Sequence, residues 1–156
     1  MFGPSKNPFE PLTMVHAVAG DESHERALIL DLLDHPYLDL VSLAFERHDR
    51  VMGWLLGLAH LTGMLFAAAL TRSDLDPHEL ERLASTTFAR QSSTARSILD
   101  EDAALYYAIQ RLNPFRGEVY AAVTAALGDL TGAVERGDVR RFSAVLVRAA
   151  AMLPEE

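Results

Sequence analysis

The sequence predicts a mainly α-helical protein, a helical bundle preceded by a short strand–helix–strand segment. From about residue 48 onward, every segment carries apolar residues at helical spacing, and no run of β-branched residues interrupts them. Before that point, two short alternating segments flank one amphipathic stretch. The connections between the predicted helices are short, as in a compact bundle.

The first 46 residues are predicted to form the strand–helix–strand segment. Residues 1–12 contain Pro4, Pro8 and Pro11, so we expect them to be irregular or extended. A strand is predicted at 13–19, a helix at 22–35 and a second strand at 38–45. This order is typical of the edge of a parallel α/β sheet. We therefore predict two regions, an α/β remnant at 1–46 and a helical domain at 47–156.

The helical domain is predicted to contain six helices. Asp76 and Asn113 precede two of them as N-caps, because an Asp or Asn side-chain oxygen accepts from the free N–H groups of a first helical turn. Gly137 ends another helix, because glycine readily adopts a left-handed backbone conformation. The predicted helices are 48–71, 77–84, 86–99, 102–112, 114–136 and 138–153.

Charge and cysteine content exclude several functions. The formal net charge of -8 argues against binding to nucleic acid, which depends on clustered lysine and arginine. Without cysteine, the chain forms no disulfide and no thiolate site. The N-terminus does not have the pattern of a signal peptide, so we expect a cytoplasmic protein.

Residues 51–70 contain no charged side chain over a length that can span a membrane, and Gly53 and Gly57 form a small-xxx-small pair. A small membrane protein is therefore one hypothesis. His60 in the middle of the segment and the flanking Arg47, Arg50 and Arg72 argue against it. We favour a buried helix, which in a chain of this size most easily arises when two copies form a homodimer.

His60 is the candidate functional residue that the helical pattern singles out. It lies among apolar neighbours, where an unpaired imidazole is costly and needs either a partner or a ligand. The six histidines are spaced too widely for a helical metal site, so we predict no metal. The nine glycines nowhere form a phosphate-binding fingerprint, and no Ser/His/Asp set is evident, so we predict neither a cofactor site nor catalytic residues.

Several motifs together resemble the prephenate dehydrogenase family. His48-Asp49-Arg50 followed by VMGWLLGLAH, with His60 twelve positions after His48, is similar to the start of a long helix in that family. Three further stretches follow in the family's order: MFGP at the front, STTFARQSSTARSILDED and ALYYAIQRLNP. The resemblance extends from Met1 to about Phe142 and so covers nearly the whole chain.

The resemblance implies a fold and a function. It implies an intertwined helical dimer, like the 6-phosphogluconate dehydrogenase C-terminal-like domain. Members oxidatively decarboxylate prephenate, or the related arogenate, during tyrosine biosynthesis, and they pass hydride to NAD or NADP. The resemblance implies that His60 faces the substrate and that Arg90 and Arg96 are candidates for binding its carboxylates, since a planar guanidinium suits that role. Ser97 stands where an arginine is usual, which leaves one carboxylate contact open.

The family motif reads His-Pro-Met-Phe-Gly-Pro, and this chain begins at its methionine. The resemblance implies that the histidine acting as general base, the glycine-rich loop and most of the sheet belong to a separate or missing nucleotide-binding domain. We therefore expect the chain alone to be inactive and to bind no cofactor. The alternative is a stand-alone, non-catalytic helical dimer that binds a ligand or docks onto a partner.

Overall fold

The computed structural model describes residues 10–153, so the MFGP motif and most of the proline-containing segment lie outside the described residues. The chain divides into two compact units, Met1–Phe115 and Arg116–Glu156. The first holds the strands and most of the helices, and the second holds a helical hairpin. The boundary predicted between residues 46 and 47 stays a prediction.

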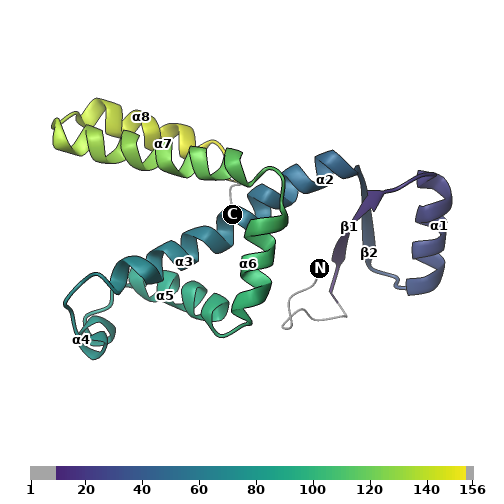
Figure 1. The fold of residues 1–156 in the computed structure, drawn as a ribbon, viewed down its shortest axis with the longest axis horizontal. Coiled ribbons are helices and arrows are strands. Elements are labelled where there is room, and N and C mark those ends of the chain that lie inside the picture. Colours follow the sequence, from purple (N-terminus) through teal and green to yellow (C-terminus); the bar gives the residue numbers. More distant parts are fainter. Residues whose placement is uncertain (1–9, 154–156) are drawn as a thin grey trace. The chain divides into compact units, whose positions relative to one another are not determined.

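The first unit begins with a parallel two-stranded sheet whose strands are connected by one helix (Figure 1). Strands β1 (Leu12–Val18) and β2 (Leu38–Ala44) pair from Leu12 opposite Leu38 to Val18 opposite Ala44. Helix α1 (Glu22–Leu33) connects them. Asp21 caps α1 by accepting from the His24 N–H, and Asp34 ends it with a left-handed φ of 37°. The predicted order of strand, helix and strand is confirmed.

Much of the apolar surface in this β–α–β segment is uncovered. Leu12 and Leu40 are buried, whereas Leu32 of α1 is 84% exposed. Other large apolar side chains that are exposed here are Leu28, Leu30, Leu33, Tyr37 and Val41. Two strands and one helix bury too little apolar area to hold such a unit firmly by packing alone.

A continuous helix of 26 residues, Phe45–Leu70, follows β2 directly. It consists of α2 (Phe45–Met52), a π-helical stretch η1 (Gly53–Leu58) and α3 (Ala59–Leu70). The helix begins three residues before the predicted start at His48, because Ala44 is still extended and the chain turns into the helix without a loop. The π-helical stretch was not predicted.

The uncharged helix is long and apolar enough to cross a membrane by length and composition, with a mean hydropathy of 1.6 over its best window. Only 17% of that window is buried within the structure. Trp54, Leu55 and Leu65 are among its exposed side chains. A single helix of this kind is a weak indication of a membrane span, since core helices of soluble proteins meet the same criterion.

Three further helices complete the first unit: α4 (Pro77–Arg82), α5 (Thr86–Leu99) and α6 (Ala103–Leu112). Their N-caps are Asp76, as predicted, then Ser85 and Asp102, and each side chain accepts from a free N–H of the first turn. Helices α3 and α5 pack closely, because Gly63 allows Ile98 to approach the α3 backbone.

The second unit is a hairpin of α7 (Arg116–Glu135) and α8 (Val139–Ala150). Gly137 turns the chain with a φ of 65°, as predicted for a glycine that ends a helix. An exposed ion pair of 2.7 Å joins Asp129 of α7 to Arg141 of α8. Helix α8 ends three residues before the predicted Leu153.

Overall, the described residues are mainly helical with one small parallel sheet, which confirms the coarse fold class. The intertwined dimer and the more specific fold assignment stay predictions.

Candidate functional site

His60 lies at the start of α3, where its ring meets Tyr106 of α6 edge to face. The ring centroids are 4.8 Å apart at an interplanar angle of 81°. The Nδ1 atom is buried and has no hydrogen-bond partner among the described residues. Burial lowers the pKa of His60, so the imidazole is neutral near pH 7 and offers one donor and one acceptor. A buried ring nitrogen without a partner is the feature expected of a residue that contacts a ligand.

Tyr106, the ring neighbour of His60, lines a cavity of about 300 Å³, whereas His60 itself lines neither this cavity nor the larger one described next. Tyr107, Gln110 and Glu101 supply polar groups to its wall. The remaining lining is mostly apolar, from Met64, Ile98, Leu99 and Ala103. A mostly apolar cavity with a few polar groups is typical of a small-molecule site.

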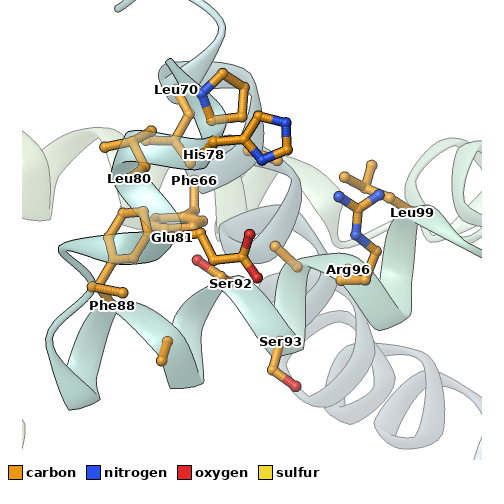
Figure 2. Close-up of a pocket in the computed structure, with 15 residues that line it drawn as sticks. Phe66, Leu70, His78, Leu80, Glu81, Phe88, Ser92, Ser93, Arg96 and Leu99 are labelled. Carbon is orange, nitrogen blue, oxygen red and sulfur yellow. The ribbon is translucent and has the colours of Figure 1, made fainter. Parts of the chain in front are cut away.

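A second cavity, of about 640 Å³, lies between α3, α4 and α5 (Figure 2). Its floor is apolar and includes Phe66 and Phe88, whose rings contact edge to face at 5.5 Å. Arg96, His78 and Glu81 bring charged or titratable groups to its lining. Leu99 lines both cavities, so the two approach each other at the C-terminal end of α5.

The structure does not bring the three predicted site residues to one cavity. Arg96 lines the larger cavity, is 74% exposed along its side chain and lies 3.9 Å from Asp100 in a loose ion pair. Arg90 is exposed and lines neither cavity, and no contact described here joins either arginine to His60. His60, Arg90 and Arg96 all stay predicted substrate-binding residues.

A polar cluster that the sequence reasoning missed joins β1, β2 and α1. His16 contacts Glu25 at 2.8 Å through Nε2 and Ser42 at 3.4 Å through Nδ1. Ser42 lies opposite His16 in the strand register, which could have been found only by pairing two strands 26 residues apart. The cluster resembles a Ser–His–acid set, but Ser42 lies within a regular strand rather than on a sharp turn with oxyanion donors.

Glu25 also determines whether the turn between β1 and α1 could hold a dinucleotide. Its carboxylate accepts from the Ala19 N–H at 3.1 Å and the Gly20 N–H at 2.6 Å. The pKa of Glu25 is lowered mainly by the hydrogen bond from the Ala19 N–H, and further by His16 and the Gly20 N–H. Burial of the carboxylate raises the pKa but does not cancel this effect. In dinucleotide-binding folds, such backbone N–H groups bind the pyrophosphate. Here an internal carboxylate takes them, so this turn does not fit NAD or NADP.

Among residues 10–153, no three His, Asp or Glu side chains gather so that they could hold a metal ion.

Comparison with known proteins identifies the family of the chain. Residues 44–148 match the prephenate dehydrogenase dimerization domain, and the chain belongs to this family. A curated relative, the probable arogenate/prephenate dehydrogenase of Methanocaldococcus jannaschii, is 25% identical over 154 residues. That alignment covers 96% of this chain and 34% of the relative, so the chain spans about a third of the relative's length. The predicted family resemblance is confirmed.

Proposed function

We propose that this chain is the substrate-binding and dimerisation region of an enzyme that oxidatively decarboxylates prephenate or arogenate in tyrosine biosynthesis, with NAD or NADP as hydride acceptor. The family match over residues 44–148 supports the reaction class. The buried, unpartnered Nδ1 of His60, whose ring contacts the cavity-lining Tyr106, is the observation that carries the proposal to a site.

In this proposal, the neutral His60 imidazole contacts a carboxylate or hydroxyl of the ligand. Prephenate is a dicarboxylate with an apolar ring, so it needs hydrogen-bond donors within a mostly apolar pocket. Tyr106 and Tyr107 offer further polar groups around the cavity. Arg90 and Arg96 are the proposed carboxylate partners on α5, for which a bidentate guanidinium is well suited.

We propose that a nucleotide-binding domain, in the same polypeptide or in a separate one, supplies the cofactor site and the general base. The internal occupation of the β1–α1 turn by Glu25 supports a cofactor site elsewhere. The exposed apolar residues of the β–α–β segment offer a surface on which further sheet or helices could pack. The chain alone is then inactive.

We also propose that the uncovered apolar residues of Phe45–Leu70 pack against a second copy in a cytoplasmic homodimer. The family's description as a dimerization domain and the low burial of this helix support the proposal. An obligate interface of at least roughly 2,000 Å² is expected. Light scattering after purification without detergent should give the mass of two chains. A monomer, or a chain that dissolves only in detergent, would contradict the homodimer.

The test of the function is titration calorimetry of the full chain with prephenate and with arogenate, followed by an assay for NAD(P)H formation. Binding of either ligand, without turnover until a nucleotide-binding partner is supplied, supports the proposal. Absence of binding by a folded dimer contradicts the role assigned to His60.

The alternative is a non-catalytic dimer that binds the ligand as a sensor or docks onto another enzyme. The occupied β1–α1 turn also favours this alternative. Mass spectrometry of the native protein distinguishes the two. Peptides that read in frame upstream of Met1 and contain the His-Pro pair indicate the enzyme, whereas a mature protein starting at Met1 favours the sensor or docking role.

A further inference from the structure

The face of α6 that meets the long helix makes three contacts along it, in antiparallel order. Tyr106 meets His60, Gln110 donates from Nε2 to the Gly57 carbonyl at 2.9 Å, and Asn113 donates from Nδ2 to the Asp49 carbonyl at 2.6 Å. Residues 106, 110 and 113 lie four and three positions apart, so they share one side of the helix and its C-cap. Helix α6 is thereby held in register against the long helix.

The middle contact falls on the π-helical stretch Gly53–Leu58. The change from α to π hydrogen bonding alters which N–H each carbonyl faces, and such turns often lie at functional sites. The Gln110 amide supplies a donor to the Gly57 carbonyl near the end of this stretch. Asn113 packs against its beginning, since a Cβ on Gly53 would lie 3.3 Å from Asn113 Oδ1.

His60 is three residues beyond Gly57, so the π turn determines the direction of its side chain. A π turn holds one more residue than an α turn, so the side chains that follow it are rotated about the helix axis by one residue's rotation, roughly 100°. Without the π turn, the imidazole would no longer point at Tyr106.

We propose that Gln110 is a positioning residue for His60: its hydrogen bond to the Gly57 carbonyl holds the π turn, and the π turn directs the imidazole toward Tyr106, which lines the small cavity. The inference deepens the proposed function and rests on it only in taking His60 as the ligand contact.

The test compares Gln110→Met, which keeps the length of the side chain but cannot donate, with the packing control Leu40→Val in β2. NMR of the full chain follows the His60 ring protons, their nuclear Overhauser contacts to Tyr106 and the pKa of His60. Glu101, Tyr106 and Tyr107, the titratable groups of the cavity wall, are the same in all three proteins.

In Gln110→Met, we expect the His60–Tyr106 contacts to weaken and the pKa of His60 to rise toward its ordinary value, because the ring becomes more hydrated. Prephenate affinity should fall about tenfold, the effect of one lost hydrogen bond. Leu40→Val should change none of these. Unchanged His60 contacts and pKa in a folded Gln110→Met protein overturn the proposal.

If Gln110→Met does not fold, hydrogen exchange of the Gln110 side-chain amide in the unmodified protein replaces it. Slow exchange together with strong His60–Tyr106 contacts supports the positioning role, and fast exchange overturns it. If His60 moves as expected but neither protein binds prephenate or arogenate, the positioning role holds and the proposed function is wrong.

Discussion

The β–α–β segment and the helix pair α3–α5 are held together by opposite means. In the first, a polar network joins His16, Ser42 and Glu25 to the backbone of the β1–α1 turn, and Arg26 donates to the Leu40 carbonyl. In the second, Gly63 lets Ile98 pack directly against the helix backbone. Both segments leave apolar side chains exposed, but only the α3–α5 pair has buried side chains, Ala95 and Ile98, at a close helix contact.

The comparison shows how to interpret two of the partly buried histidines, His16 and His60. Both ring nitrogens of His16 have partners, and the residue serves to tie two strands to a helix. His60 has a buried nitrogen without a described partner, and its ring contacts Tyr106, which lines a cavity. Since buried polar atoms are nearly always paired, the unpaired one is the better indicator of a ligand site.

The largest effect is expected where packing is closest. Gly63→Val should destabilise the fold by about 2–3 kcal/mol, because the added side chain overlaps the end of the buried Ile98 side chain, which must shift within a close helix contact. The control is Gly128→Val in α7, where an added Cβ meets nothing within 4 Å. Urea unfolding measures both. Equal losses for the two variants would show that α3 and α5 do not pack as described.

Exchanging each histidine for phenylalanine should give opposite signs. His60→Phe should stabilise the fold by about 1 kcal/mol, because it removes an unpaired buried nitrogen, while prephenate affinity falls about tenfold or more. His16→Phe should destabilise the fold, because it breaks the contacts to Glu25 and Ser42. Thermal unfolding measures the stability of the two variants, and calorimetry measures their affinity for prephenate. If both substitutions destabilise the fold, His16 and His60 do not differ in the way described.

A smaller effect is expected from Glu25→Gln, and it should depend on pH. The pKa of Glu25 is lowered in the folded state, so its ionised form stabilises the fold above the ordinary value of 4.5. This stabilisation is lost as the pH falls through the lower folded value. The stability difference between the wild type and Glu25→Gln should therefore be largest near pH 7 and shrink below pH 4.5. Urea unfolding across this pH range tests the prediction, with Glu22→Gln as control. A stability difference between the wild type and Glu25→Gln that does not change with pH would count against the polar network of Glu25.

The smallest effect is expected in the α7–α8 hairpin. Asp129→Asn removes the exposed ion pair with Arg141, which lowers the pKa of Asp129 in the folded protein. Exposed pairs contribute little and are screened by salt. The variant should melt slightly below the wild type at low ionic strength, and the two should converge at high salt. Equal melting temperatures for the variant and the wild type at both low and high ionic strength would mean that the ion pair contributes nothing to stability.

Periodicity and capping residues predicted the order and type of the elements, and most bounds agree within three residues. The sequence could not predict the π turn, because Gly53 and Gly57 equally suit close helix packing, and the deciding contacts come from Gln110 and Asn113 more than 50 residues later. Nor could it predict the His16–Ser42 contact, which depends on strand register. His60 was identified because its apolar surroundings make an unpaired nitrogen costly.

The π turn has a consequence for assembly along the long helix. Coiled-coil packing requires an apolar stripe that recurs about every 3.5 residues on one side of a helix. The stretch Gly53–Leu58 shifts that phase, so residues before it and after it belong to different stripes. The helix thus presents two short seams instead of one continuous heptad register. A substitution scan of assembly over Phe45–Leu70 should show two periodicities, out of step by one residue.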